Sequence, residues 1–225
     1  MCIRDRDGTV VLADHQSAGK GRREHAFYSP AGAGIYMSVL LRPSASVSAM
    51  NPFLIRISLA VADAIESMCG LNVQIKWPND IFWNGKKLCG ILTNCSISAE
   101  DSLLEYVVAG IGVNVKENSF PDEIPAVSLE EALQSSVNRH ALAALILEKM
   151  EAFYRAGEVG TLSSEQIMHY ERRMEFLGKQ AKINYMDGRS VDCRILGIGA
   201  EGFLRAQTKQ DTIVIRSGEA SIQTC

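Results

Sequence analysis

The segment LLEYVVAGIGVNV, residues 103–115, restricts the fold more than any other part of the sequence. It is long and almost wholly apolar, which predicts a strand. A sheet that contains such a strand must be packed against other elements. Residues 52–68 supply one of them, because their apolar side chains recur at helical spacing and Gly70 follows as a C-terminal cap. The sequence therefore predicts helices packed on a sheet.

Further strands and helices follow from local signals in the same part of the chain. Apolar, β-branched runs predict strands at 9–14, 34–43 and 72–77, and Asn84-Gly85 predicts a hairpin with a type I′ turn. Capping residues and glycines delimit the other helices. We expect one short helix opened by the capping box of Ser128 and Glu131, and two longer ones at 140–157 and 163–177.

The last part of the chain has a different character. From residue 179 onward, short alternating strands are separated by Asp-Gly and Gly turns, which predicts a small all-β barrel of SH3-like size. We therefore expect a larger domain at 1–177 and a small β-domain at 178–225. The fold class of the larger domain is α+β, with a mixed or antiparallel sheet flanked by helices.

Composition excludes several classes of protein. The 225 residues carry a formal net charge of −3, which argues against a nucleic-acid binder with a broad basic face. No apolar run reaches the roughly 18–20 residues that span a membrane. The histidines and cysteines lack metal-ligand spacing, so we expect no structural metal site. Several of the six cysteines lie in apolar runs, which predicts reduced thiols in a cytoplasmic protein.

The loop ADHQSAGKGRREHAFYSPAGAG, residues 13–34, concentrates small and cationic residues in a slightly acidic chain. It matches neither a Walker A loop nor the strand–GxGxxG–helix context of a dinucleotide fold. Its glycines free the backbone, while Lys20, Arg22 and Arg23 can converge on an anion and shield it from water. On composition alone, a solvated charge run is the other interpretation.

Three further segments carry candidate site residues. IKWPND, residues 75–80, places Lys76 and Asp80 at a strand–turn–strand corner. In KKLCGIL, Lys87 lies near the start of an apolar strand, where it needs an anionic partner unless it snorkels outward. In AGIGVNV, glycines within a strand mark a close approach by a ligand or another backbone, and Asn114 can donate and accept hydrogen bonds. Each feature alone is also compatible with a solvated or structural role.

Taken together and in order, these motifs resemble those of biotin protein ligases. The chain carries GKGRR, FYSP, GIYMSVLLRP, KWPND, KLCGIL and GIGVNV in the order of that family. The resemblance runs from about Gly8 to the C-terminus and includes the small β-domain. It implies a catalytic domain similar to class II aminoacyl-tRNA synthetases. No helix-turn-helix precedes this region, so the resemblance is to the ligase-only type without a DNA-binding domain.

The resemblance implies an activity and its substrates. Members join biotin to ATP, forming biotinoyl-5′-AMP and pyrophosphate, and then transfer biotin to one lysine of a biotin carboxyl carrier domain. Mg²⁺ would arrive with ATP. Neither nucleic acid nor membrane is an expected partner, and family members are monomers or dimers that pair through the sheet. The alternatives are a lipoate or octanoate transferase of the related fold and a truncated ligase that binds biotin or nucleotide without turnover.

The same resemblance implies roles for individual residues. Lys87 should bridge the biotin carboxyl and α-phosphate oxygens, and Asp80 should orient the site and the incoming carrier lysine. Arg22 should contact the phosphate or the biotin carboxylate. Gln16 should bind the biotin ureido group, and Phe27 lies where a Trp usually packs against adenine. The remaining expected binding residues are Gly19, Lys20, Gly21, Arg23, Lys76, Gly90, Gly110, Gly112 and Asn114, the last of them toward nucleotide or metal.

The sequence departs from the family pattern in three places. Glu24 and His25 replace the glycine and arginine that usually follow, which makes the loop stiffer and less cationic. Phe27 replaces the Trp, which keeps a stacking face but removes an indole donor. Family members also carry an upstream Ser-Thr-Asn segment that helps to bind biotin, whereas the match here begins at about Asp7-Gly8. We therefore expect a strand, a helix and part of the biotin site to be missing.

Overall fold

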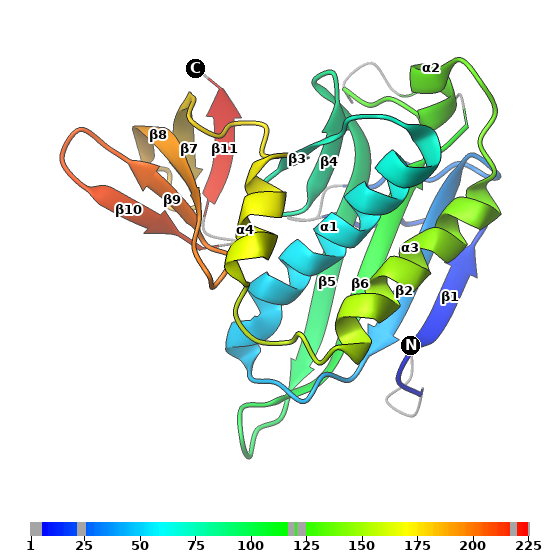
Figure 1. The fold of residues 1–225 in the computed structure, drawn as a ribbon, viewed down its shortest axis with the longest axis horizontal. Helices are drawn as coiled ribbons and strands as arrows, with labels where there is room; N and C mark the ends of the chain where they lie inside the picture. Colours follow the sequence, from blue (N-terminus) through cyan, green and yellow to red (C-terminus); the bar gives the residue numbers. More distant parts are fainter. Residues whose placement is uncertain (1–5, 22–25, 117–119, 121–124, 217–219, 225) are drawn as a thin grey trace.

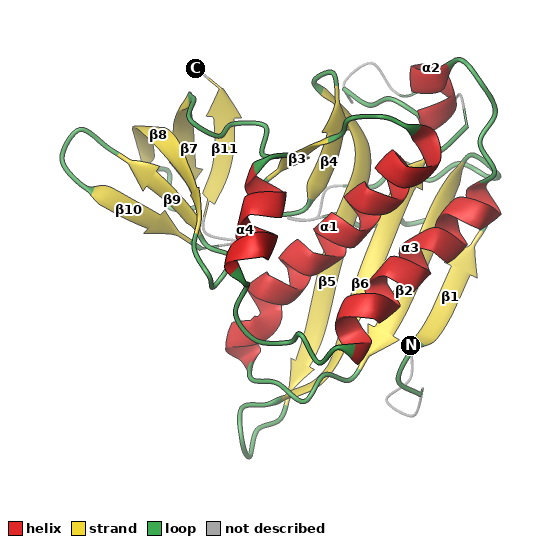
Figure 2. Cartoon of the chain, in the orientation of Figure 1, coloured by secondary structure: helices red, strands yellow, loops and turns green. Residues whose placement is uncertain are grey.

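The structure, a computed structural model, describes residues 6–21, 26–116, 120, 125–216 and 220–224. Within these ranges the strands form two sheets that lie side by side, with helices against the larger one (Figure 1). The larger sheet has six strands in the order β1-β2-β6-β5-β4-β3, and each neighbouring pair is antiparallel. Helices α1 and α3 lie across one of its faces (Figure 2). The predicted α+β class is confirmed, and the sheet is antiparallel.

The elements of the larger sheet and its helices alternate along the chain. The strands are β1 (Thr9–Ala13), β2 (Gly34–Leu41), β3 (Gln74–Lys76), β4 (Asp80–Trp83), β5 (Lys86–Ile97) and β6 (Leu104–Asn114). The helices are the short 3-10 turn η2 (Val47–Ala49), α1 (Met50–Cys69), α2 (Leu129–Leu133), α3 (Arg139–Arg155) and α4 (Ser164–Glu171).

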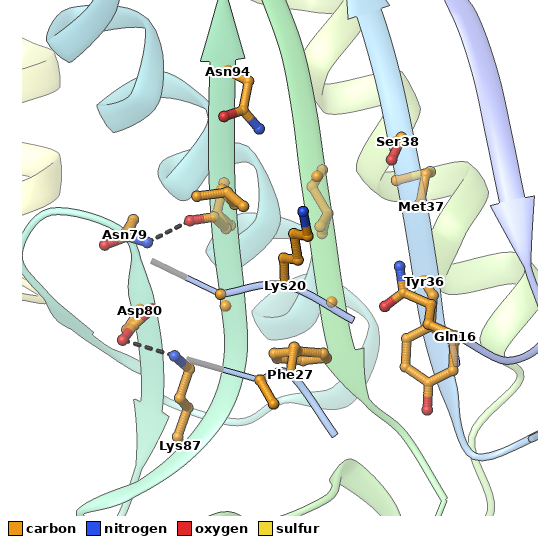
Figure 3. A pocket seen from close by; sticks show the side chains of 18 of the residues that line it. Gln16, Lys20, Phe27, Tyr36, Met37, Ser38, Asn79, Asp80, Lys87 and Asn94 are labelled. Atoms are coloured by element: carbon orange, nitrogen blue, oxygen red, sulfur yellow. Dashed lines mark hydrogen bonds and ion pairs between the residues drawn. The ribbon is translucent and has the colours of Figure 1, made fainter. Parts of the chain in front are cut away.

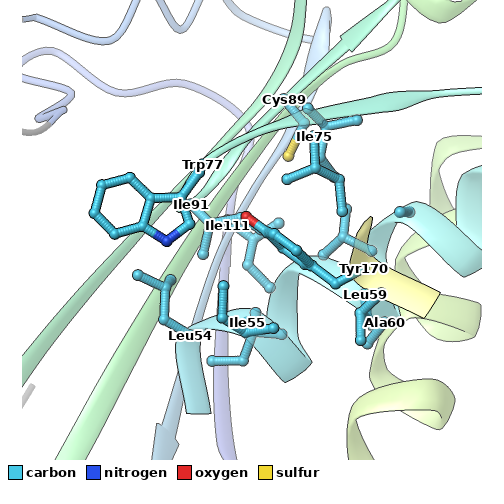
Figure 4. Packing of buried hydrophobic residues seen from close by; sticks show 14 of the residues in the cluster. Leu54, Ile55, Leu59, Ala60, Ile75, Trp77, Cys89, Ile91, Ile111 and Tyr170 are labelled. Atoms are coloured by element: carbon cyan, nitrogen blue, oxygen red, sulfur yellow. The ribbon is translucent and has the colours of Figure 1, made fainter. Parts of the chain in front are cut away.

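One face of the larger sheet is closed by α1. The helix is apolar nearly all round in its middle, as expected for a helix packed between a sheet and a second helix. On the sheet, alternate residues of each strand point into this core, among them Cys89 and Ile91 of β5 and Ile111 of β6 (Figure 4). Their neighbours in the sequence point to the opposite face. The apolar alternation of the strands thus decides which face of the sheet is left open.

Local signals located most of these elements correctly. Asn84 and Gly85 have φ values of 47° and 75°, which are the positive angles that a type I′ turn requires, and they join β4 to β5. Gly70 ends α1 in the left-handed conformation, with φ 67°. Ser128 caps α2 by accepting from the Glu131 amide at 3.2 Å. The predicted hairpin, the long helix and its cap, and the short helix are therefore confirmed.

The helix predicted at 163–177 was too long, because α4 ends at Glu171. Beyond that residue the backbone pairs with β3 instead of continuing the helix. The Ile75 amide donates to the Arg173 carbonyl at 2.6 Å, and the Glu175 amide donates to the Ile75 carbonyl at 3.0 Å. These bonds form an isolated bridge between Ile75 and Met174, so tertiary pairing overrides the helical pattern.

The smaller sheet contains the C-terminal strands β7 (Gln180–Tyr185), β8 (Ser190–Ile198), β9 (Leu204–Gln207), β10 (Thr212–Ile215) and β11 (Ala220–Thr224). Its order is β10-β9-β8-β7-β11, with antiparallel neighbours throughout the described residues. Buried contacts join this sheet to the rest of the molecule. The indole Nε1 of Trp77 donates to the Gly202 carbonyl at 3.0 Å, and the Leu162 amide donates to the Ala200 carbonyl at 2.8 Å. Buried apolar residues of both sheets therefore form one continuous core.

Within the described ranges, none of the helices combines the length and the hydropathy that crossing a membrane requires.

The start of α3 gives a test of the fold. The side-chain oxygen of Asn138 accepts from the amides of His140 and Ala141, each at 3.1 Å, and so satisfies two amides that the helix cannot pair. We expect Asn138→Ala to lower the free energy of unfolding by about 1 kcal/mol in urea denaturation. Asn138→Ser keeps an oxygen acceptor and should lose much less. Equal losses for the two variants would contradict the capping role.

Candidate functional site

A cavity of about 610 Å³ lies on the open face of the larger sheet. Figure 3 looks onto this face, with the helices behind the strands. The floor is made by the outward-facing residues of β2, β5 and β6, and one wall is made by the loop that follows β1. Ile222 of β11 also lines the cavity, so the smaller sheet contributes to its boundary. The site therefore draws on segments from both ends of the chain.

Glycines form the middle of this floor. Gly112 of β6 pairs with Gly90 of β5 on one side and with Tyr36 of β2 on the other. A Cβ on Gly112 would lie 2.5 Å from the Phe27 ring, which is too close for any side chain. A Cβ on Gly90 would lie 3.1 Å from Cε of Lys87. The glycines therefore make room for an aromatic ring and for a lysine side chain directly on the sheet backbone.

The loop over the floor contains residues 16–21 and 26–29, which we call the lid segment; residues 22–25 lie outside the described part of the chain. Its two arms are hydrogen bonded to each other. The Phe27 amide donates to the Gly19 carbonyl at 2.9 Å, and the Ser29 hydroxyl donates to Oε1 of Gln16 at 2.8 Å. These bonds place the Phe27 ring over β6 (Figure 3). Lys20, on the same segment, also lines the cavity.

A lysine–carboxylate pair stands beside the glycine floor. Nζ of Lys87 lies 2.8 Å from Oδ2 of Asp80, and both side chains are about 30% exposed. Asp80 begins β4 and Lys87 is the second residue of β5, so the Asn84-Gly85 hairpin brings them together. The sequence prediction placed these residues in one site, and the structure does the same. A partly exposed pair keeps donor and acceptor atoms available to a ligand.

The corner between β3 and β4 fixes where Asp80 begins. The Asn79 side chain donates to the Ile91 carbonyl, and the Ile91 amide donates to the Asn79 carbonyl at 3.2 Å. Lys76 lines the cavity, while its ammonium lies 5.6 Å from the ring centroids of both Phe82 and Phe176. The corner is therefore bonded to β5, the strand that carries Lys87.

Asn114 has a different position from the other candidates. It is buried and is not among the described residues that line the cavity. Its amide donates to the carbonyls of Lys87 and Val127, each at 3.3 Å. In this arrangement Asn114 supports the backbone of Lys87 from below. A contact between Asn114 and nucleotide or metal stays a prediction.

Several residues of the cavity were missed by the sequence analysis. Tyr36 lies beside Gly112, its hydroxyl donates to the Pro30 carbonyl at 3.0 Å, and burial raises its pKa to about 12. Ser38 and Asn94 are polar members of the floor on β2 and β5. The signal that could have found them is strand alternation, because residues two apart along a strand share a face with a known site residue.

The predicted site residues fall into three groups. Arg22 and Arg23 lie outside the described residues, as do Glu24 and His25. Asn114 and Gly19 are not among the residues that line the cavity, although a Cβ on Gly19 would lie 2.4 Å from the Phe27 carbonyl oxygen. The cavity brings together the remaining predicted residues, which are Gln16, Lys20, Gly21, Phe27, Lys76, Asp80, Lys87, Gly90, Gly110 and Gly112.

The charges of the site suit an anionic ligand. Lys20, Lys76 and Lys87 line the cavity, and Asp80 is the one carboxylate among the described residues that do so. In the same part of the chain, no group of three or more His, Cys, Asp or Glu side chains could hold a metal ion. The three ammonium groups can neutralise carboxylate or phosphate oxygens of a ligand in the cavity.

Comparisons with known proteins agree with this chemistry. Residues 5–114 match the model of the biotin/lipoate A/B protein ligase family. The bifunctional ligase/repressor BirA of Bacillus spizizenii is 34% identical over 220 residues, which are 96% of this chain and 66% of that protein. The biotin–[acetyl-CoA-carboxylase] ligase of Mycobacterium tuberculosis is 28% identical over 96% of this chain and 79% of its own length. This chain therefore spans just under two thirds of the Bacillus relative.

Solved structures extend the similarity to the whole chain. A biotin protein ligase from Aquifex aeolicus in complex with biotin and ATP superposes with a TM-score of 0.84. It is 26% identical, and the match covers 99% of this chain and 91% of that one. The similarity thus includes the smaller C-terminal sheet as well as the segment that the family model matches. On these grounds, residues 5–114 carry the domain of the biotin/lipoate A/B protein ligase family, and the chain as a whole is similar to biotin protein ligases.

Proposed function

We propose that this protein is an ATP-dependent biotin protein ligase. It forms biotinoyl-5′-AMP from biotin and ATP, and then transfers the biotinyl group to one lysine of a biotin carboxyl carrier domain. The observation that carries the proposal is the Lys87–Asp80 pair, 2.8 Å apart, beside a glycine floor beneath the lid segment. The biotin and ATP bound by the Aquifex relative support the choice of substrates.

In the first half-reaction, a carboxylate oxygen of biotin attacks the α-phosphorus of ATP. The bond from that phosphorus to the oxygen bridging to the β-phosphate breaks, and pyrophosphate leaves. Lys87 donates from its ammonium to the carboxylate and α-phosphate oxygens, where negative charge is concentrated as they approach each other. Lys20 adds positive charge from the lid segment. The protein contributes positioning, charge neutralisation and exclusion of water, and no enzyme nucleophile is needed.

In the second half-reaction, the amine of the carrier lysine attacks the acyl carbon of the adenylate. The carbon–oxygen bond to AMP breaks, an amide bond forms, and the amine loses a proton. Asp80 stands at the edge of the site, where its carboxylate can accept a hydrogen bond from the incoming amine. Because it also holds Lys87, one carboxylate serves both halves of the reaction.

Mg²⁺ fits this site as a companion of the nucleotide. Asp80 alone among the described residues of the cavity offers a carboxylate, which matches a cation held mainly by phosphate oxygens and water. When bound, Mg²⁺ would supply further charge neutralisation at the phosphates.

Other parts of the prediction remain proposals. Residues 1–177 and 178–225 would form two domains, of which the second is an SH3-like barrel; the five short C-terminal strands support this. The edge strand β1 exposes Val11 and Leu12, so two copies could pair through it. A cytoplasmic location would fit the free thiols of Cys69, Cys89 and Cys95.

The proposal is tested by direct labelling. The protein is incubated with ATP, Mg²⁺, biotin and a biotin carboxyl carrier domain, and the carrier is probed with streptavidin. Lipoate replaces biotin in a parallel reaction read by mass spectrometry. Labelling with biotin alone supports the proposal. Labelling with lipoate alone would favour a lipoate transferase, and adenylate formation without transfer would reveal an incomplete ligase.

Removal of the Lys87 ammonium should block the first half-reaction. We expect Lys87→Ala to lower the rate of biotin-dependent pyrophosphate release by about 10²-fold or more, because it removes the donor to the reacting oxygens. The adjacent Lys86 offers a matched control: it is more exposed and pairs with Glu131 at 3.6 Å, away from Asp80. Lys86→Ala should change the rate less than about twofold. An unchanged rate in Lys87→Ala would rule out the assigned role.

A methyl group on the glycine floor should weaken nucleotide binding. In Gly112→Ala the new Cβ would lie 2.5 Å from the Phe27 ring, so the ring must leave its place over β6. We expect the KM for ATP to rise about tenfold, as for the loss of one good stacking contact. Gly160→Ala, whose Cβ meets nothing within 4 Å, serves as the control.

The steric origin of that effect can be isolated. In a Phe27→Ala background there is no ring for the methyl group to displace, so Gly112→Ala should cause little further loss. A tenfold rise in both backgrounds would show that the methyl group acts on the ligand directly and not through Phe27.

A further inference from the structure

A buried hydroxyl from a distant part of the chain contacts the corner that carries Asp80. Tyr170 of α4 is 0% exposed, and its hydroxyl donates to the Pro78 carbonyl at 3.2 Å. Figure 4 shows its ring inside the apolar core, with the oxygen directed toward the Trp77 side of the cluster. Burial raises the pKa of this phenol well above its usual range, so the group stays a neutral donor. The apolar core thus contains a hydrogen bond from Tyr170 to the corner that carries Asp80.

A second hydroxyl near the same carbonyl does not replace this donor. Ser58 of α1 lies 3.4 Å from the Pro78 carbonyl and 2.9 Å from the Leu54 carbonyl. A serine hydroxyl has one proton, and the shorter contact takes it. Tyr170 is therefore the better placed of the two hydroxyl donors. Without it, a buried carbonyl would lose its stronger partner.

The bond fixes a peptide group that leads directly into Asp80. The carbonyl of the Pro78–Asn79 peptide accepts from Tyr170, and the amide of the same peptide donates to the Lys76 carbonyl at 3.2 Å. Both polar ends of this peptide plane are thus held. Asn79 is in turn bonded to β5, and Asp80 follows it in the chain. Rotation of the peptide plane would change the direction in which the Asp80 side chain leaves the strand.

Tyr170 also connects this corner to the smaller sheet. The next residue, Glu171, accepts from the Ile198 amide of β8 at 2.9 Å. In Figure 1, α4 lies between α1 and the smaller sheet. The last turn of α4 is therefore bonded to β8 through Glu171 and to the corner before Asp80 through Tyr170.

We propose that Tyr170 is a positioning residue for the Asp80–Lys87 pair, and that through Tyr170 and Glu171 the placement of the smaller sheet sets the geometry of that pair. The inference rests on the proposed ligase function. Tyr170 does not line the cavity, so its effect reaches the reacting atoms only through the corner. Loss of its hydroxyl should consequently slow the chemical step while substrates still bind.

The first test is Tyr170→Phe, which removes one oxygen atom and keeps the ring. We expect kcat for biotin-dependent pyrophosphate release to fall about five- to tenfold, with the KM for biotin changed less than twofold. Tyr154→Phe is the matched control, because its hydroxyl contacts Asp7 and Arg42 on α3's side of the fold. It should leave both parameters within twofold of the wild type. Urea denaturation of each variant verifies that it is folded.

A double-mutant cycle tests whether Tyr170 acts through Asp80. In an Asp80→Asn background the carboxylate is already lost, so Tyr170→Phe should cause less than a twofold further fall in kcat. A full five- to tenfold fall in both backgrounds would overturn the proposal. Equal losses of kcat in Tyr170→Phe and Tyr154→Phe would also overturn it, because they would reflect general destabilisation.

Glu171→Ala tests the same connection from the other side without altering the core around Tyr170. It should lower kcat about threefold and leave the KM for biotin unchanged. An unchanged kcat would show that the smaller sheet does not affect the Asp80–Lys87 pair.

The wild-type protein separates this inference from the proposed function. If the wild type forms no biotinoyl-5′-AMP, the ligase function fails. If it is active and Tyr170→Phe is equally active, only the positioning role fails.

Discussion

Successive residues of a β-strand point to opposite faces of its sheet, and this constraint divides the larger sheet into two working surfaces. On one face, residues such as Ile91 and Ile111 are closed off by α1 and α3. On the other, Gly90 and Gly112 leave the backbone bare under the cavity. The same strands therefore supply the apolar burial that stabilises the fold and the flat floor on which the site is built. A shift of one residue in register would exchange the two surfaces.

The positions of the functional side chains depend on hydrogen bonds made by residues outside the cavity. Lys87 and Asp80 lie on the two strands of one hairpin. Residues that do not line the cavity form hydrogen bonds to the backbone around them. Asn114 donates to the carbonyl of Lys87, and Tyr170 donates to the carbonyl of the Pro78–Asn79 peptide. A site of this kind needs few charged residues, because buried hydrogen bonds fix the directions of those it has.

Sequence reasoning succeeded where structure is determined locally. Helical spacing located α1, and the Asn84-Gly85 turn located the hairpin that pairs Lys87 with Asp80. The family motifs pointed to the loop after β1 as part of the site, and its described residues Gln16, Lys20, Gly21 and Phe27 line the cavity. These features are encoded within short stretches, so a single chain is sufficient to recognise them. The charge run of the lid could be interpreted only through its neighbours, because composition alone does not distinguish a ligand-binding loop from a solvated one.

What the sequence did not reveal depends on contacts between distant segments. The end of α4 is set by pairing with Ile75, about a hundred residues upstream. Tyr170 reads as an ordinary apolar position of a helix, and nothing local indicates that its hydroxyl meets the Pro78 carbonyl. Asn114 carries the right chemistry for a ligand, yet its amide is engaged by two backbone carbonyls. Sheet order likewise follows from long-range pairing and not from any one strand.

The internal bonds of the lid segment have a consequence for affinity. Oε1 of Gln16 already accepts from Ser29, and the Phe27 ring already covers the glycine floor. A ligand that uses either group must first exchange these contacts for its own, so a measured dissociation constant reports a difference between two sets of interactions. Substitutions that weaken the internal contacts of the lid segment could thus raise the affinity for a ligand without adding any contact to the ligand. The affinity of such a site for its ligand depends as much on the contacts of the unliganded loop as on the groups that touch the ligand.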